Sequence, residues 1–338
     1  MFSQSEAIQV LTSILTSNDP TIAVGPGLDD VGVLEVRTGH LAVSVDYTNF
    51  KPLGTELGAT SLFDKGYLLI LHNVSDLIAS GAKPLAAVVA LGLPAAVSIS
   101  DIEALGMGIR LAADECGLAI VGGDTKEAPC LALNATVFGY IGAAGHWGRG
   151  YAREGDLLFV TGGIGGVSAS VVALKKKIGS ADLTDKCRQA LSKPSLPLDL
   201  ASRLRNNNAR IAAIDLSDGL GIDAHRLANA SRVGLEIDGA RIPMHPLADE
   251  VAKLLNLDPL QFAFGFGGDG QFIFALESQY EMLAIQAGAI KIGKILGSNE
   301  RVLLTSKGQF SLPTFGHEDF TGIGSVDRLM LMLEHPLW

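Results

Sequence analysis

Short apolar runs that stop at glycine or aspartate recur along the chain, and they constrain its fold more than any other feature. In LAIVGGDTKEAPCLAL (118–133), a buried-strand pattern meets two glycines, Asp124 follows, and a second apolar run begins. The 338 residues include 40 glycines, more than an average chain carries. We therefore expect strands that end in tight turns, where the backbone can approach a ligand closely.

The apolar patterns predict helices and strands that alternate without a regular repeat. Ser100 is the expected cap of the helix at 101–115 and Gly117 its end, while the stretch from about 177 to 199 reads as a polar connection. Because no clean βαβ series appears, the predicted class is α+β. The glycine-rich segment 145–156 predicts a boundary between domains 1–148 and 149–338. The other predicted helices are 5–16, 55–80 and the segment after 166, and the predicted strands are 32–36, 41–45, 85–93, 118–121, 131–141 and 157–160.

Charge and composition exclude several classes of partner. The net charge is −10 and the densest basic run is 175–177, which argues against nucleic acid and anionic membranes. No apolar stretch reaches the roughly 18 residues of a membrane helix, and the N-terminus lacks the pattern of a signal peptide. Cys116, Cys130 and Cys187 are widely spaced, as expected for reduced thiols. We expect a cytoplasmic protein with a small-molecule substrate.

Aspartates stand at the ends of many of these apolar runs. Each could simply cap a turn or a helix start, which is the commonest role of aspartate there. If they converge, their mutual repulsion requires divalent cations, and oxygen ligands beside glycine turns suit Mg²⁺ with a nucleoside triphosphate better than zinc or iron. Both interpretations stay open. The residues are Asp29, Asp30, Asp46, Asp124, Asp215, Asp218 and Asp269.

The turn TGGIGG (161–166) offers backbone N–H groups at a helix start, where a phosphate can bind. Tight packing explains its glycines equally well. It lacks the Lys-Ser/Thr of a P-loop, and the spacing of a dinucleotide fingerprint does not fit. Among the few cations, Lys126 is a better candidate for phosphate binding than Arg149 or Arg153.

Eight stretches in one order make the chain resemble the superfamily of aminoimidazole ribonucleotide (AIR) synthetase, also called PurM-like. Its other branches are selenophosphate synthetase, the hydrogenase maturation dehydratase and thiamine-monophosphate kinase, and the resemblance to the last is the strongest. The stretches are GPGLDDVGVL (25–34), SVDYT (44–48), NVSDLIASGAKP (73–84), VGGDTKEAP (121–129), RGYAREGDLLFVTGGIGG (149–166), AIDLSDGLGIDAHRLANASRVGLEID (213–238), FGGD (266–269) and FGHEDF (315–320).

The resemblance implies a two-domain PurM-like fold, in which the N-terminal α/β domain pairs with a second copy into a dimeric β-barrel and the C-terminal domain is α+β. It implies an ATP- and Mg²⁺-dependent kinase that phosphorylates thiamine monophosphate in thiamine biosynthesis, a transfer that rests on positioning and charge neutralisation. Asp124 and Asp218 would take part in catalysis, and Asp269 and Phe50 would face the acceptor. The implied metal ligands are Asp29, Asp30, Asp46, Asp76, Asp124 and Asp218, and the implied nucleotide contacts are Gly123, Thr125, Lys126, Arg149 and Ser217.

Two segments depart from the kinase pattern. Residues 46–53 read DYTNFKPL where the kinase usually has DTLVEGxHF, and residues 267–273 read GGDGQFI where it usually has GGEDYEL. Because both would face the acceptor, a related enzyme that phosphorylates another small molecule, as in amide or carboxamide activation, is the alternative. A non-catalytic nucleotide-binding scaffold is the third hypothesis.

Overall fold

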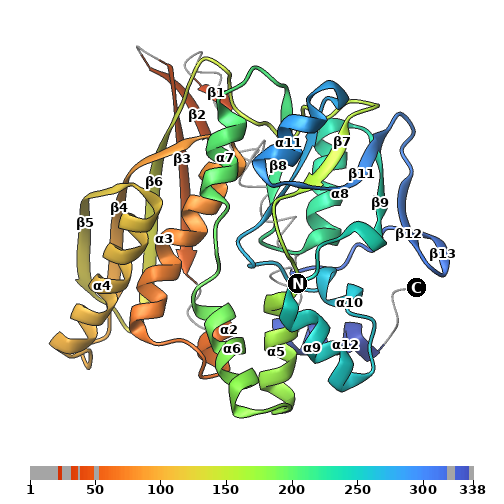
Figure 1. Cartoon of the computed structure of the whole chain (residues 1–338). Coiled ribbons are helices and arrows are strands. Elements are labelled where there is room, and N and C mark those ends of the chain that lie inside the picture. Colours follow the sequence, from red (N-terminus) through yellow and green to blue (C-terminus); the bar gives the residue numbers. More distant parts are fainter. Residues whose placement is uncertain (1–21, 25–31, 37–38, 49–52, 318–323, 335–338) are drawn as a thin grey trace, which may run out of the picture.

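A computed structural model shows the chain folded around two β-sheets with helices packed against them (Figure 1). It describes residues 22–24, 32–36, 39–48, 53–317 and 324–334. The first sheet comes from the N-terminal part of the chain and the second from the remainder, so the predicted α+β class is confirmed. The helix predicted over 5–16 lies outside the described residues.

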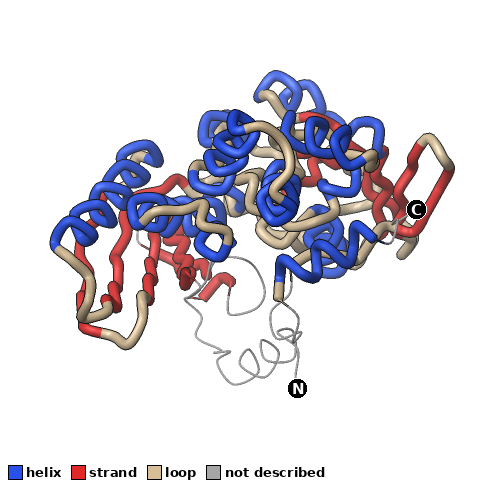
Figure 2. The backbone as a smooth tube through the Cα atoms, turned by 90° about the horizontal axis from the view of Figure 1, so that it is seen from below, coloured by secondary structure: helices blue, strands red, loops and turns tan. Residues whose placement is uncertain are grey.

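The first sheet has six strands in the order β1-β2-β3-β6-β4-β5, and only β4 and β5 run parallel. Helices α3 (Leu62–Ala79) and α4 (Ile99–Cys116) lie along one side of it (Figure 2). Along β6, every second residue from 133 to 141 is buried, whereas those between are partly or fully exposed. One face therefore packs on helices and the other is open. The strands are β1 (Ile22–Val24), β2 (Gly32–Val36), β3 (Gly39–Thr48), β4 (Lys83–Leu93), β5 (Ala119–Glu127) and β6 (Ala132–Ile141).

Two helix boundaries differ from the prediction because of their caps. The helix predicted over 55–80 is two, α2 (Leu53–Glu56) and α3, separated by Gly58 at φ +62° and begun again at Ser61. Ser98, and not Ser100, caps α4. Each cap exchanges hydrogen bonds with an aspartate three residues later, which satisfies two otherwise unpaired backbone N–H groups.

The second sheet has seven strands in the order β13-β12-β9-β11-β7-β10-β8. Helix α6 replaces part of the polar connection predicted over 177–199, because its apolar residues at 183, 187 and 191 form one buried stripe. The strands are β7 (Leu157–Val160), β8 (Ile211–Asp215), β9 (Gly234–Asp238), β10 (Phe272–Leu276), β11 (Ile290–Leu296), β12 (Arg301–Thr305) and β13 (Gly308–Ser311). The helices are α5 (Gly166–Lys176), α6 (Ala181–Ser192), α7 (Leu198–Arg205), α8 (Leu220–Ser231), α9 (Pro246–Leu255), α10 (Leu260–Ala263), α11 (Glu281–Ala287) and α12 (Ser325–Glu334).

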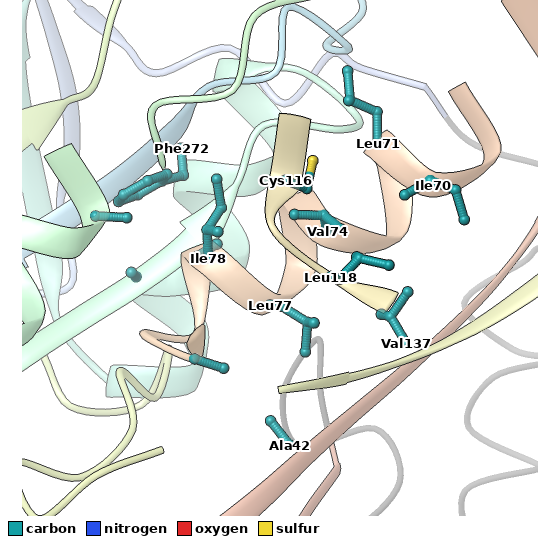
Figure 3. Close-up of a cluster of buried hydrophobic side chains, with 14 of the residues drawn as sticks. Ala42, Ile70, Leu71, Val74, Leu77, Ile78, Cys116, Leu118, Val137 and Phe272 are labelled. Carbon is teal, nitrogen blue, oxygen red and sulfur yellow. The ribbon is translucent and has the colours of Figure 1, made fainter. Parts of the chain in front are cut away.

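Helix α3 joins the two halves through a shared core. Figure 3 shows its Leu77 and Ile78 among side chains that include Val137 of the first sheet and Phe272 of the second. Trp147 lies where the chain crosses from the first half to the second. Its backbone N–H donates to Ser80 O at 2.9 Å, and its ring lies 6.2 Å from that of Phe272. The predicted boundary at 148/149 falls in this packed crossing segment and stays a prediction. None of the described helices is long and apolar enough to cross a membrane.

Candidate functional site

Helix α3 and strand β3 bring two of the predicted metal ligands to one interface. The buried Ser44 hydroxyl donates to Asp76 Oδ2 at 2.6 Å. Asp46 lies two residues beyond Ser44 and so on the same face of β3. Asp46 and Asp76 therefore lie on facing surfaces of the helix and the sheet.

The neighbouring residue of α3 reaches the DLSDG loop (215–219), which links β8 to α8. The Ser75 hydroxyl donates to Asp215 Oδ2 at 3.5 Å, at the buried end of β8. Consecutive α3 residues thus contact both sheets, and the helix connects Asp76 with this loop. Sequence reasoning placed Asp215 at a strand end but left it out of the implied ligand set.

The backbone of the DLSDG loop is held from two other segments. Leu216 donates its N–H to Gln271 O and accepts from the N–H of Gly268, both at 2.9 Å, and the N–H of His317 donates to Asp218 O at 2.8 Å. Gly219 has φ +116°, and a Cβ there would lie 2.1 Å from Gly265 O. The loop therefore requires glycine and has little room to move.

The Asp218 side chain is paired with an arginine that the sequence prediction missed. Arg226 Nη1 donates to Asp218 Oδ2 and, at 2.8 Å, to Asp223 Oδ1. Asp223 is fully buried, and its Oδ2 accepts the N–H groups of Asp218 and Gly219 at 3.1 and 3.0 Å. Burial lowers the pKa of Arg226, but the two carboxylates outweigh it and raise that pKa above its ordinary value. The spacing D-x4-D-x2-R at a helix start was the signal that could have revealed this group.

Asp46 and Asp124 were predicted beyond strand ends, but both lie within strands, because β3 and β5 extend to residues 48 and 127. Asp46 pairs with Ala135 on β6, Ala135 with Val89 on β4, and Val89 with Gly123 on β5. Asp124 is one residue further and so on the opposite face, three strand spacings or about 14 Å away from Asp46. A single chain does not place these two carboxylates side by side.

The nucleotide-binding candidates near Asp124 are exposed on β5. Lys126 Nζ lies 3.7 Å from Asp124 Oδ1, and Thr125 between them is exposed. A Cβ at Gly123 would lie 2.3 Å from Val89 O, so close strand pairing requires glycine there. Ser217 is exposed on the DLSDG loop. The roles of these residues stay predictions.

Arg149 lies at the other end of α8 from Asp218. Ser231 Oγ donates to Arg149 O at 2.7 Å and accepts the N–H of Ala152 at 3.1 Å. Because α8 ends at Ser231, the Arg149 backbone lies about 18 Å along the helix from Asp218. The predicted contact of Arg149 with the nucleotide stays a prediction.

Asp269 occupies the helix start that TGGIGG was predicted to offer to a phosphate. Its carboxylate accepts the N–H groups of Gly165 and Val167 at 2.8 and 2.9 Å. Burial raises the pKa of Asp269 above its ordinary value, although these amide donors oppose the shift. The turn therefore binds a carboxylate of its own chain, which agrees with the capping interpretation and leaves a substrate role for Asp269 as a prediction.

The side chain of Gln271 is held by hydrogen bonds to two other segments of the chain. Thr161 Oγ1 donates to Gln271 Oε1 and Gln271 Nε2 donates to Ser195 O, both at 2.9 Å. Phe272 is buried in the core, so its side chain does not face a substrate. Of the departures in 267–273, Asp269, Gly270 and Gln271 are partly exposed, whereas Phe272 and Ile273 are buried.

The donor chemistry of Asp46 and Asp76 fits Mg²⁺, which binds through one or two carboxylates together with phosphate oxygens and water. Across the described ranges, no three histidine, cysteine, aspartate or glutamate side chains lie close enough to hold a metal ion. Asp29, Asp30 and Phe50 lie outside those ranges. The full set of six aspartate ligands stays a prediction.

Comparison with known proteins identifies relatives over most of the chain. Family models described as AIR synthase related protein, N-terminal domain and C-terminal domain, match residues 28–141 and 153–302. A thiamine-monophosphate kinase of Rhodopirellula baltica is 32% identical over 295 residues, covering 82% of this chain and 85% of the relative.

Two solved structures share the fold. AaThiL complexed with AMPPCP and TMP aligns with a TM-score of 0.81 at 24% identity, over 94% of this chain and 97% of the other. Thiamine-monophosphate kinase from Stenotrophomonas maltophilia K279a aligns with a TM-score of 0.69 at 28% identity, over 88% and 94%. These similarities confirm the two-domain PurM-like fold.

Proposed function

This chain belongs to the thiamine-monophosphate kinase family of AIR synthase related proteins, and on that basis we propose that it phosphorylates thiamine monophosphate with ATP. The 32% identity to a curated kinase over 82% of the chain is the observation that carries the proposal. A structure that shares its fold holds AMPPCP, an analogue of ATP, together with TMP. In the reaction, the bond between the β,γ-bridging oxygen and the γ-phosphorus of ATP breaks, and a phosphate oxygen of the acceptor bonds to that phosphorus. The products are ADP and thiamine diphosphate.

The reaction asks the protein mainly to position two phosphates and to offset their charge. The DLSDG loop and α3 carry the candidate carboxylates, and the backbone of both segments has little freedom to move. We propose that the nucleotide phosphates lie near Asp46, Asp76 and Asp218. Arg149, Lys126 and the neighbouring nucleotide candidates belong to the same proposal.

We propose Mg²⁺ as the cofactor, with Asp46 and Asp76 among the residues that would hold it. When bound, it would neutralise phosphate charge that builds up during transfer. Asp29, Asp30 and Asp218 complete the proposed set on one chain. Asp124, which lies on the other face of the sheet and about 14 Å from Asp46, would join it only from the second copy of a homodimer. The support is the donor chemistry of aspartate and the contact of Ser44 with Asp76.

The open face of the first sheet supports a homodimer. It carries large apolar side chains that are well exposed, among them Val45 at 61%, Tyr47 at 53% and Tyr140 at 37%. Such a surface favours burial against a second copy. The free thiols of Cys116, Cys130 and Cys187 support a cytoplasmic location.

The direct test is to incubate the purified protein with ATP, Mg²⁺ and thiamine monophosphate and to measure ADP and thiamine diphosphate. Asp76→Asn should lower turnover by at least about tenfold, because it changes a ligand candidate. Asp185→Asn, on the exposed face of α6, is the matched control and should leave turnover unchanged. Formation of neither product would refute the kinase assignment.

A second candidate is a related enzyme with a different small-molecule acceptor, and Gln271 favours it, since the kinase usually has tyrosine there. ADP release with another acceptor and none with thiamine monophosphate would select it. Binding of a nucleotide without turnover on any acceptor would select the scaffold hypothesis.

A further inference from the structure

The backbone around Asp218 is already fixed without any contribution from Arg226. Asp223 Oδ2 accepts the N–H groups of Asp218 and Gly219, and the N–H of His317 donates to Asp218 O. Gly219 closes against Gly265. The main freedom left to Asp218 is therefore rotation of its side chain.

Arg226 restricts that rotation. Its Nη1 contacts Asp218 Oδ2 and Asp223 Oδ1, so one nitrogen bridges the two carboxylates. Within the described part of the chain, Asp218 Oδ1 makes no hydrogen bond. The bridge thus holds one oxygen of Asp218 and leaves the other available, while the Asp218 side chain retains 18% exposure.

An ordinary helix-start ion pair does not account for this arrangement. Asp223 alone caps the amide groups before α8, so the bond from Arg226 to Asp218 adds nothing to helix capping. A cation near a helix N-terminus is also unfavourable for the helix dipole. The bond instead fixes the orientation of the Asp218 carboxylate. It also offsets the repulsion between this carboxylate and that of Asp223.

We propose that Arg226 is a positioning residue, which acts through Asp218 and fixes its carboxylate for nucleotide binding and phosphoryl transfer. The inference rests on the proposed function, in which Asp218 serves the nucleotide phosphates. In this proposal Arg226 touches Asp218 and Asp223 and neither substrate. Its whole effect on binding therefore passes through Asp218.

The test is a double-mutant cycle on nucleotide affinity. Calorimetry with AMPPCP and Mg²⁺ compares the wild type, Arg226→Gln, Asp218→Asn and the double variant. Arg226→Gln should weaken binding by about tenfold or more, as loss of a supporting partner commonly does. Added to Asp218→Asn, it should cause no further loss, because a residue that acts through another has no effect once that residue is neutralised.

Two further variants separate positioning from a structural role. Arg226→Lys keeps a cationic nitrogen and should restore affinity to within about threefold of the wild type. Arg241→Gln removes an exposed arginine with the same i,i+3 spacing to an aspartate and should bind like the wild type. If Arg226→Gln does not fold, all four proteins of the cycle are made in Asp223→Asn, where Arg226→Gln no longer leaves a buried unpaired carboxylate.

Losses that multiply in the double variant would overturn the proposal, as would wild-type affinity in Arg226→Gln or no recovery in Arg226→Lys. Because calorimetry needs no acceptor, the result is independent of the acceptor assignment. A wild-type protein that binds AMPPCP but does not phosphorylate thiamine monophosphate refutes the proposed acceptor and leaves the cycle valid.

Discussion

Helices α3 and α4 touch through their backbones, and this contact predicts opposite effects for two substitutions on one helix. A Cβ at Gly108 of α4 would lie 1.9 Å from Phe63 O, whereas at Gly106 it would meet nothing within 4 Å. An ordinary contact begins at 3.4 Å, so Gly108→Ala must separate the helices by about 1.5 Å, which is 3.4 minus 1.9. Because Phe63 O is a backbone atom, no side-chain rotation can relieve the overlap.

The expected change in the free energy of unfolding follows from two opposing effects. Replacing glycine by alanine inside a helix stabilises it by about 1 kcal/mol, and overpacking in a closed core costs about 3 kcal/mol at the upper end of its usual range. Gly108→Ala should therefore destabilise the protein by about 2 kcal/mol, whereas Gly106→Ala should stabilise it by up to about 1 kcal/mol.

Urea unfolding followed by circular dichroism measures both variants against the wild type. The midpoint of Gly108→Ala should fall and that of Gly106→Ala should stay or rise. Equal midpoints would refute the reasoning, because they would mean that the two backbones do not touch at Gly108. Turnover should fall in Gly108→Ala as well, since α3 carries Ser75 and Asp76.

Three other predictions test separate features. Arg210→Gln leaves the buried Asp156 without its paired cation and should cost about 3–5 kcal/mol, seen as a lower melting temperature. Burial raises the pKa of Cys116 to about 12 from an ordinary 9.0, so the stability that its proton contributes is complete below about pH 9 and is lost as the pH rises toward 12. Urea midpoints at about pH 8 and 10 should therefore diverge less in Cys116→Ala than in the wild type. Ser44→Ala removes the 2.6 Å bond to Asp76. The loss of transition-state stabilisation, calculated from kcat, should exceed the loss of unfolding free energy, calculated from urea midpoints, as parallel kinetic and urea measurements would reveal.

The sequence predicted most of the fold where local physics decides it. The strands at 32–36, 131–141 and 157–160 were found from apolar runs. Gly117 ends α4 as predicted, and the structure shows it in the left-handed conformation. Strand β5 was predicted too short, because its polar half, residues 122–127, is exposed and carries no apolar pattern. Pairing with the parallel strand β4 keeps that half extended. Partners far away in the chain supply that information, and a single sequence does not display them.

The candidate site was harder to predict from the sequence than the fold, because aspartate accepts hydrogen bonds in the same way at a helix cap and at a ligand site. Asp269 and Asp223 both accept backbone N–H groups at helix starts, whereas Asp76 accepts a hydroxyl from another element. Nothing in the residues next to them separates these cases. The difference lies in what contacts each side chain. The start of α5 presents amide groups to Asp269, the DLSDG loop before α8 presents them to Asp223, and β3 presents Ser44 to Asp76. Assigning a carboxylate to capping or to ligand binding therefore requires the tertiary neighbours, even where the strand-end pattern has located the carboxylate correctly.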